Sequence, residues 1–192
     1  MSAYDPYRLP SDLPVPADDG AAEHLLGLTV PHLRFPATTG GELDLAELAS
    51  GRLVLFCYPR TGRPGVDPLP GWDAIPGARG CTPQACAYRD HHADLVGLGA
   101  SVVGLSAQTA QQQREFAERS HIPFPLLSDP GLELSRALRL PTFTVAGQSF
   151  YRRLTFVAEA GTLVRIHYPV FPPDTDAERV VEWLRARSRP DA

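Results

Sequence analysis

A continuous apolar run constrains the fold of this chain more than any other feature. Residues 53–58 are apolar at every position and are followed by Pro59, which is typical of a strand buried on both faces of a sheet. A second buried run, residues 101–106, follows a segment with helical spacing. A strand, a helix and a strand in succession predict two parallel strands joined by a right-handed crossover. We therefore expect an α/β protein.

The rest of the chain is predicted to form a short arm and one domain. Residues 1–25 are rich in Pro, Asp and Ala and lack periodicity, which predicts an irregular N-terminal arm. Residues 26–189 have a length typical of a single domain. The further elements that we expect are a short strand at 32–35, helices at 44–48, from Thr109 and around 132–138, a strand at 124–127, a hairpin of 142–145 with 153–157, a strand at 163–168 and a final helix capped by Asp174.

Composition excludes several classes of partner and location. The formal net charge of −4 argues against a nucleic-acid or an anionic-membrane partner. No apolar run approaches the roughly 18 residues that a membrane span needs. The first residues show no secretory signal, and three cysteines are too few for a disulfide scaffold. We therefore expect a cytoplasmic protein with reduced thiols.

Two cysteines stand five residues apart at the predicted start of a helix. Thr82 is the expected N-cap and Pro83 the expected first helical residue, with the helix continuing to about Leu98. Cys81 would then lie where unpaired backbone amides and the helix dipole stabilise a thiolate. On a continuous helix the two Cα atoms would be about 8–9 Å apart, whereas a disulfide requires less than about 7 Å. If Cys81 and Cys86 pair, the first turns of the helix must unwind.

Other interpretations of these cysteines stay open at this point. Both could be small core residues, as most buried cysteines are, and Cys57, in the middle of the apolar run, is expected to be one. A zinc site made of Cys81, Cys86 and His91 or His92 is disfavoured, because C-x4-C is not the usual ligand spacing. We expect no metal and no other cofactor.

The cysteine segment resembles the peroxiredoxins, and within them the bacterioferritin-comigratory, or Q-type, group. The resemblance is carried by Phe56-Cys57-Tyr58-Pro59 and by Gly80-Cys81-Thr82-Pro83-Gln84-Ala85-Cys86-Ala87-Tyr88-Arg89-Asp90. It extends from about Leu28 to Leu184 and includes the segments at 126–129 and 153–157. The resemblance implies a thioredoxin-like (peroxiredoxin) fold, in which helices flank a central mixed sheet, and a thiol peroxidase activity.

The resemblance also implies roles for individual residues. Cys81 matches the peroxidatic cysteine, which attacks a hydroperoxide and becomes a sulfenic acid. Cys86 matches the resolving cysteine, which forms an intramolecular disulfide that thioredoxin or a similar dithiol then reduces. Arg153 matches the arginine that holds the thiolate and polarises the peroxide, and Pro59 matches the proline that shields the pocket. Thr82 is a further candidate for substrate binding.

The segment before Cys81 departs from the family pattern P-x-x-x-T-x-x-C. Ala78 stands where the threonine belongs, and Pro59 lies 22 residues before Cys81, so that about 15 residues are inserted. Thr61 is the candidate to replace the missing hydroxyl. The segment 60–80, which includes Trp72, is expected to be either a lid or a passive surface loop.

Two neighbouring features have alternative interpretations. Arg152 could replace Arg153, but adjacent residues of a strand face opposite sides. The segment Leu140-Pro141-Thr142 is similar to the cis-proline segment of thioredoxin, but residues 153–156 fit the equivalent peroxiredoxin strand better, so we interpret Pro141 as part of a turn.

The main hypothesis is thus a two-cysteine peroxiredoxin, monomeric or homodimeric, that reduces hydrogen peroxide or organic hydroperoxides. The missing threonine motivates an alternative, a thiol–disulfide oxidoreductase or redox sensor of thioredoxin fold with little peroxidase turnover. A third class is an interaction module that keeps the fold without the chemistry. The sequence alone does not identify the preferred hydroperoxide or the reductant.

Overall fold

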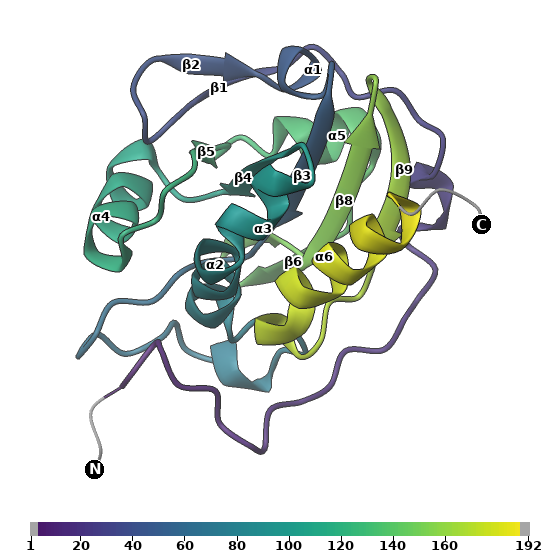
Figure 1. Cartoon of the computed structure of the whole chain (residues 1–192). Coiled ribbons are helices and arrows are strands. Elements are labelled where there is room, and N and C mark those ends of the chain that lie inside the picture. Colours follow the sequence, from purple (N-terminus) through teal and green to yellow (C-terminus); the bar gives the residue numbers. More distant parts are fainter. Residues whose placement is uncertain (1–3, 189–192) are drawn as a thin grey trace.

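A computed structural model of the chain describes residues 4–188 and has a five-stranded mixed sheet at its centre (Figure 1). The strand order is β5-β4-β3-β8-β9. β3 is parallel to β4, and β4 to β5, whereas β8 is antiparallel to both β3 and β9. The strands are β3 (Arg52–Cys57), β4 (Ala100–Ser106), β5 (Leu126–Ser128), β8 (Leu154–Glu159) and β9 (Thr162–His167). The predicted α/β class and the parallel strand pair are confirmed.

Helices cover both faces of this sheet, as Figure 1 shows. One face packs against α2, α3, α4 and α6, and the other against α1 and α5. The helices are α1 (Leu45–Leu48), α2 (Cys81–Asp90), α3 (His92–Gly97), α4 (Ala110–Ser120), α5 (Glu133–Leu138) and α6 (Asp176–Arg187). Three short 3-10 helices lie at Glu23–Leu25, Trp72–Ala74 and Pro173–Thr175.

The central strand β3 shows why a continuous apolar run was required. Leu55 and Cys57 point into the core on one face of the sheet, while Phe56 and Tyr58 enter the core on the other. All four side chains are fully buried. Because successive strand residues face opposite sides, only a run apolar at every position suits a strand covered on both faces.

Two small hairpins lie outside the main sheet. The first pairs β1 (Arg34–Pro36) with β2 (Glu42–Asp44). The second pairs β6 (Thr142–Val145) with β7 (Gln148–Tyr151). The prediction that 142–145 pairs with 153–157 was therefore wrong, because the chain turns back at once after Gly147 and residues 154–159 join the main sheet instead.

Several predicted helix boundaries also differ from the structure. The single helix expected from Thr82 to Leu98 is two helices, since the chain departs from helical geometry at His91. Its N-cap is Gly80 rather than Thr82, so that Pro83 is the third helical residue rather than the first. Asp174 belongs to a 3-10 turn, and α6 begins two residues later.

Elsewhere the predicted elements are present with shifted ends. The strand expected at 32–35 runs over Arg34–Pro36, and the one expected at 124–127 over Leu126–Ser128. Thr109 caps α4 through a capping box with Gln112, as its position before the amphipathic stretch predicts. These differences are a few residues each and leave the order of elements unchanged.

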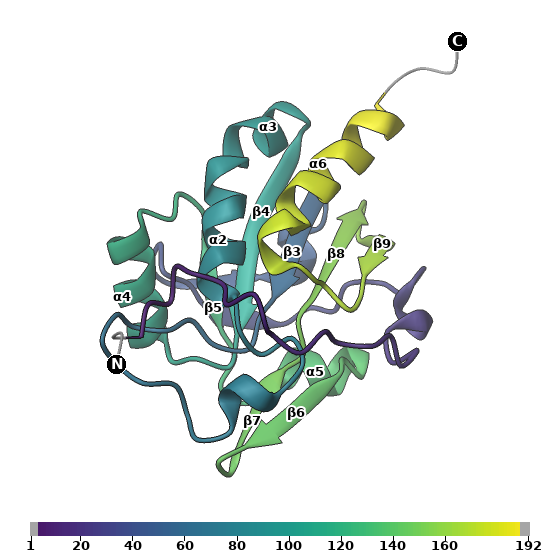
Figure 2. The ribbon, with the colours of Figure 1, turned by 90° about the horizontal axis from the view of Figure 1, so that it is seen from below.

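The N-terminal arm lies against the loops at one end of the sheet. Residues 4–22 contain no strand and no α-helix, and Figure 2 shows this segment passing the N-terminal end of α2. Tyr4 lies against Gly62, and Leu9 lies against Gly80. The first three residues of the predicted arm, and Arg189 at the end of the predicted domain, lie outside the described residues.

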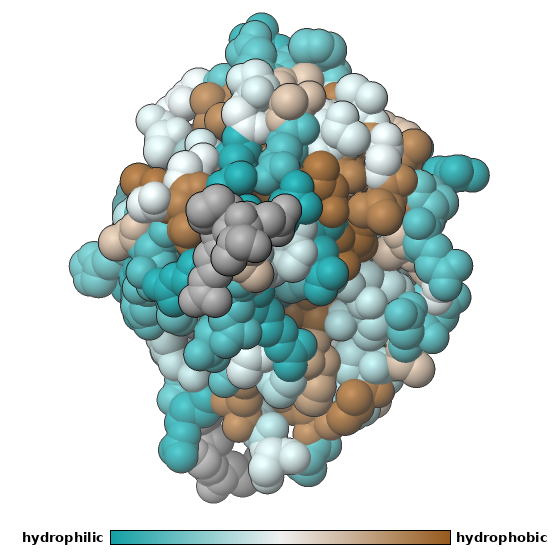
Figure 3. Space-filling model, turned by 45° about the vertical axis from the view of Figure 1, so that its right-hand side comes forward, coloured by the Kyte–Doolittle hydropathy of each residue, from teal (hydrophilic) through white to brown (hydrophobic). Residues whose placement is uncertain are grey.

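The surface is mixed in character. In Figure 3 the face turned forward is mainly hydrophilic, with several separate apolar patches. Within residues 4–188 no helix has both the length and the hydropathy of a membrane span.

Gly104 on β4 offers a direct test of the packing between sheet and helices. A Cβ atom there would lie 2.6 Å from Leu126 Cδ2 and 2.8 Å from Phe56 Cζ. We expect Gly104→Ala to lower the free energy of unfolding by about 1–3 kcal/mol, the usual cost of overpacking a core. Gly51→Ala, where nothing lies within 4 Å, is the matched control and should stay within about 0.5 kcal/mol of the parent. Equal stability of the two variants in urea unfolding would contradict this packing.

Candidate active site

Cys81 is the first residue of α2, and its sulfur is buried. Gly80 caps the helix with a φ of 98°, a left-handed conformation that glycine adopts without strain. A Cβ atom at this position would also collide with Pro173 and Leu9. Glycine is thus required twice here, and it sets Cys81 at the end of α2 where the backbone N–H groups are free of helical partners. The Cys81 side chain is only 2% exposed.

Two donors point at the Cys81 sulfur. The backbone N–H of Arg60 donates to Sγ over 3.3 Å, and Arg153 Nη2 donates over 3.2 Å. As a thiol, Sγ can itself donate to the Ala78 carbonyl at 3.6 Å. A guanidinium and an amide directed at one sulfur are donors suited to an anionic sulfur.

The Arg153 guanidinium is held in place by neutral acceptors. Nη2 donates to the carbonyl oxygens of Gly77 at 3.2 Å and Arg79 at 3.0 Å, and Nη1 donates to Gln84 Oε1. Among the described residues Arg153 makes no ion pair with a carboxylate, and its Nε finds no acceptor. Arg153 is buried, so the Cys81 sulfur lies beside a guanidinium whose charge no carboxylate among the described residues neutralises.

Gln84 connects this pair to a buried carboxylate. Its Nε2 donates to Asp176 Oδ2 at 2.9 Å while its Oε1 accepts from Arg153. The orientation of the Gln84 amide is therefore fixed from both ends. Asp176, at the start of α6, thereby sets which atom Gln84 presents to Arg153, without placing its own charge beside the guanidinium.

Asp176 is fully buried but well satisfied. It accepts from Tyr88 Oη at 2.7 Å and Thr155 Oγ1 at 2.6 Å, and His167 Nδ1 lies 3.3 Å from Oδ1. Burial alone would raise the pKa of Asp176, but these hydrogen bonds and the one from Gln84 outweigh it and hold the pKa below its usual value. The side chain is therefore an anion at neutral pH.

Cys86 lies within α2, one and a half turns beyond Cys81. The helix is continuous between the two residues, and all three cysteines are free thiols. Cys86 is half-buried, and this burial raises the pKa of its thiol above the ordinary value. The geometry matches the expectation from spacing: while α2 is intact, the two sulfurs are too far apart to bond.

The remaining predicted site residues lie nearby with different partners. Pro59 is buried beside this centre, directly before Arg60. Thr61 is also buried, but its Oγ1 and its backbone N–H both donate to Gln108 Oε1, at 2.9 Å and 2.8 Å. Thr82 is buried in the first turn of α2, and its hydroxyl has no hydrogen-bond partner among residues 4–188.

Ala78, in place of the family threonine, is fully buried and contributes only its carbonyl to the sulfur. No threonine hydroxyl makes a hydrogen bond to the Cys81 sulfur within the described part of the chain. The Thr61 proton is committed to Gln108, so this hydroxyl can offer a substrate only its lone pairs.

Cys57 and Arg152 lie apart from this centre. Cys57 is on the opposite face of β3, in the core cluster that excludes Cys81. Its complete burial raises the pKa of the thiol well above the ordinary value, so it stays protonated and inert. Arg153, directly before β8, is buried, whereas Arg152 is only half-buried and makes no contact with the sulfur.

The segment 60–80 folds into part of the site. Trp72 packs edge-on against Phe150 of β7, with ring centroids 5.1 Å apart, and Ala78 belongs to the same small apolar cluster. The end of the segment supplies the carbonyls that hold Arg153, as described above. This part of the insert is therefore a structural component of the centre, which differs from the passive surface loop that was one of the two expectations for the segment 60–80.

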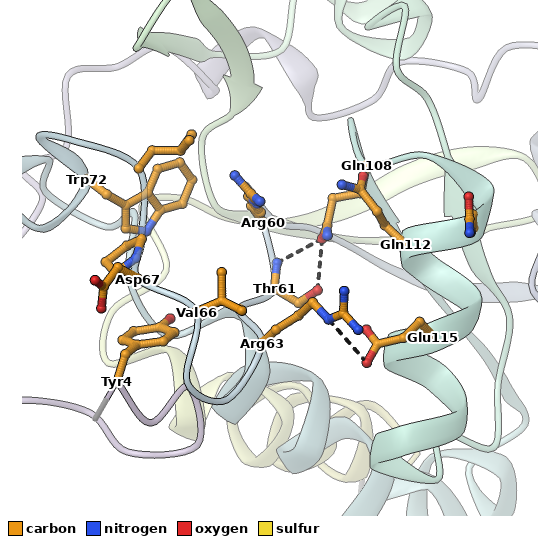
Figure 4. Close-up of a pocket in the computed structure, with 14 residues that line it drawn as sticks. Tyr4, Arg60, Thr61, Arg63, Val66, Asp67, Trp72, Gln108, Gln112 and Glu115 are labelled. Atoms are coloured by element: carbon orange, nitrogen blue, oxygen red, sulfur yellow. Dashed lines mark hydrogen bonds and ion pairs between the residues drawn. The ribbon is translucent and has the colours of Figure 1, made fainter. Parts of the chain in front are cut away.

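A pocket of about 340 Å³ opens beside the start of this segment (Figure 4). It is lined by Tyr4 of the arm, by Arg60 and the residues that follow it, and by polar side chains of α4. Figure 4 shows Thr61 and Val66 near the middle of the view, with Trp72 and Tyr4 on one side and Gln112 and Glu115 of α4 on the other. Among the described residues no group of three His, Cys, Asp or Glu side chains is placed to hold a metal ion.

Three residues of this centre were missed by reasoning from the sequence. Gln84 lies within the cysteine motif, so its position offered a signal. Asp176 is 95 residues from Cys81 in the chain, and Arg60 acts through its backbone. No pattern in the sequence marks either of these two, because only the folded chain brings Arg60 to the sulfur and Asp176 to Gln84.

Comparison with known proteins places these features in a family. The sequence pattern of the redoxin family, described as Redoxin, matches residues 25–181. The chain is 26% identical over 185 residues to chloroplastic peroxiredoxin Q of Gentiana triflora, covering 92% of this chain and 76% of that protein. A matching solved structure is peroxidoxin BcpB from Mycobacterium tuberculosis, with a TM-score of 0.68, 28% identity and coverage of 86% and 98%.

Peroxiredoxin Q of Xanthomonas campestris also shares the fold. Its TM-score is 0.64 at 21% identity, over 93% of this chain and all of that one.

Asp176→Asn tests whether the network reaches the sulfur. The amide has one acceptor oxygen fewer, so Gln84 loses its fixed orientation and Arg153 loses a partner. In a Cys86→Ser background, we expect Cys81 alkylation by iodoacetamide at pH 7 to slow by about fivefold or more, the equivalent of one hydrogen bond of about 1 kcal/mol. The midpoint of the pH profile of the alkylation rate should shift to higher pH.

Asp94→Asn, an exposed carboxylate on α3, is the control and should leave both readouts unchanged. An unaltered alkylation rate in Asp176→Asn, with an unaltered circular dichroism spectrum, would show that Asp176 does not act on Cys81.

Proposed function

Because the chain belongs to the redoxin family and is a Q-type peroxiredoxin with thiol peroxidase activity, we propose that Cys81 is the reacting atom. The Cys81 thiolate attacks the outer oxygen of a hydroperoxide, R–O–OH. An S–O bond forms, the O–O bond breaks and RO⁻ leaves, to be protonated to the alcohol. Sulfur is oxidised to the sulfenic acid and the peroxide is reduced.

One observation carries this assignment: the Cys81 sulfur accepts from both the Arg60 N–H and the Arg153 guanidinium, and no carboxylate competes for that guanidinium among the described residues. Donors fixed around the sulfur before reaction also lie where they can stabilise charge on the leaving oxygen. The unpartnered Arg153 Nε offers one such donor. Pro59 would shield this centre, with Thr61 and Thr82 as weaker candidates for substrate contact.

Cys86 is proposed to resolve the sulfenic acid. Its sulfur displaces hydroxide from Cys81, which leaves as water, and a Cys81–Cys86 disulfide forms. A dithiol such as thioredoxin then reduces this disulfide by exchange, becoming a disulfide itself. Because α2 is continuous through both cysteines, its first turns must open between the two steps. Opening also removes the burial that raises the pKa of the Cys86 thiol.

The proposed reaction also has consequences for the compartment in which the protein acts. Recycling by a dithiol requires a reducing compartment, and we propose the cytoplasm, with the protein acting as a monomer or a homodimer. The donors around Cys81 supply what peroxide reduction needs without a metal.

A second candidate function rests on the replaced threonine. Ala78 offers no hydroxyl, and the Thr61 hydroxyl is bonded to Gln108, so substrate positioning differs from the family pattern. A thiol–disulfide oxidoreductase or redox sensor would react slowly with peroxide and rapidly with disulfide substrates. Rate constants for the two substrate types, measured on the same preparation, decide between the functions.

Cys81→Ser tests the reacting atom. We expect the variant to lose peroxide reduction in a stopped-flow assay, since the serine hydroxyl is not ionised at neutral pH. Cys57→Ala is the control and should keep the parent rate, because Cys57 lies on the other side of the sheet. Full activity in Cys81→Ser would refute the assignment.

The resolving role predicts a defined product. After one equivalent of hydrogen peroxide, peptide mass mapping should find Cys81 linked to Cys86 and Cys57 still free. In Cys86→Ser the sulfenic acid should persist and be trapped by dimedone. Disulfides that involve Cys57 alone would rule out this pairing.

Resolution should depend on pH because the Cys86 thiol must lose its proton before it attacks, and burial raises its pKa while α2 is intact. Below that pKa the reactive thiolate increases about tenfold per pH unit, so disulfide formation should accelerate accordingly between pH 6 and 8. Rapid quenching followed by mass spectrometry measures this rate. A rate independent of pH would instead identify helix opening as the limiting step.

A further inference from the structure

We propose that the start of the inserted segment builds a binding site for the organic group of a neutral, apolar hydroperoxide. The inference rests on the proposed peroxidase function and names the substrate class for it. The site is the pocket of about 340 Å³ beside Arg60, a volume at the lower end of the usual range for small-molecule sites.

Two segments that are not part of the family motif P-x-x-x-T-x-x-C form this pocket, the insert and the N-terminal arm. One wall comes from residues 60–63, 66–69 and Trp72, which belong to the insert, and another from Tyr4 of the N-terminal arm. The arm and the insert are joined, because Gly65 N–H donates to the Tyr4 carbonyl at 3.1 Å. Arg79 also stacks over the Tyr4 ring at 4.7 Å. A chain with the compact motif would have no such walls.

The pocket is linked to the Cys81 sulfur through Arg60. Arg60 lines the pocket with its side chain, while its backbone N–H donates to Cys81 Sγ at 3.3 Å. A ligand in the pocket is therefore adjacent to the residue that contacts the sulfur.

The lining favours an apolar, uncharged group. Val66 and Leu69 provide apolar surface, and the Val66 side chain is 52% exposed. Trp72 also lines the pocket but is only 4% exposed. Covering the Val66 side chain removes apolar area from water, which is favourable.

The charged lining residues balance one another. They are Arg60, Arg63, Asp67 and Glu115, two of each sign, and Arg63 Nε pairs with Glu115 at 3.6 Å. The pocket thus carries no excess positive charge that would select a carboxylate-bearing hydroperoxide.

The apolar wall is also fixed in position. Trp72 is held by Phe150 and Phe143 of the β6–β7 hairpin, at 5.1 Å and 5.8 Å between ring centroids. A preformed wall lowers the entropic cost of binding. The insert therefore acts here as a fixed wall of a substrate site.

The test compares two hydroperoxides in a variant and its matched control. In Val66→Asp we expect the ratio of the rate constants for cumene hydroperoxide and hydrogen peroxide to fall about tenfold. Val96→Asp makes the same change at a valine of α3 that is 55% exposed and far from the pocket; it should leave the ratio unchanged. A ratio within twofold of the parent in Val66→Asp would overturn the proposal.

A binding measurement separates this proposal from the peroxidase assignment. In a Cys81→Ser, Trp183→Phe protein, Trp72 is the remaining tryptophan, and cumyl alcohol mimics the organic product. We expect saturable quenching of Trp72 fluorescence that weakens at least tenfold when Val66→Asp is added. Parent protein that reduces neither peroxide would refute the function, whereas absent quenching would refute the pocket. A fatty-acid hydroperoxide preferred over cumene hydroperoxide through Arg60 would also contradict the neutral class.

Discussion

The active centre depends on the buried guanidinium of Arg153, which contacts the Cys81 sulfur and no carboxylate among the described residues. Arg153 is enclosed by backbone carbonyls and one side-chain amide, and the Cys81 sulfur is 3.2 Å from its Nη2. Burying an arginine without a counter-ion is costly. The cost is lower while Cys81 is a thiolate, which is the form that the proposed reaction uses. The insert is tied to this centre because its last residues supply the carbonyls.

Asp176 and Gln84 fix the orientation of the Arg153 guanidinium but do not neutralise its charge. Asp176 is surrounded by donors from α2, β8 and β9 and reaches Arg153 only through Gln84. Placed directly beside the guanidinium, a carboxylate would compete with the thiolate. The intervening amide transmits position without neutralising the charge. Packing of α2 against α6 is therefore coupled to the reactivity of a sulfur on the first turn of α2.

Much of the fold could be predicted because its signals are local. The apolar run at 53–58 predicted a central strand, and the spacing after Thr109 predicted α4. The predicted hairpin partner of residues 142–145 was wrong. Residues 148–151 and 153–157 both follow closely in the chain, and the turn at Gly147 decides that 148–151 forms the pair. The predicted N-cap at Thr82 was wrong. Threonine is a common N-cap, but the N-cap of this helix lies two residues earlier, at Gly80, where close contact with Pro173 and Leu9 leaves room only for glycine.

The cysteine pair and the arginine could be named from a motif, but their environment could not. Arg60 contributes a backbone N–H, Asp176 is remote in sequence, and Thr61 turns to Gln108 rather than to the sulfur. All three depend on tertiary contacts that no local pattern encodes. The same holds for the pocket, which exists only because the arm and the insert meet.

The pairing of guanidinium and sulfur is tested most directly by the second-order rate constant for hydrogen peroxide with Arg153→Met. Methionine fills comparable space without charge or donors. Removing a preorganised donor of this kind typically costs about 10²–10³-fold in rate, and we expect a loss of at least about 100-fold with α2 intact by circular dichroism. A rate constant within about threefold of the parent would contradict the account.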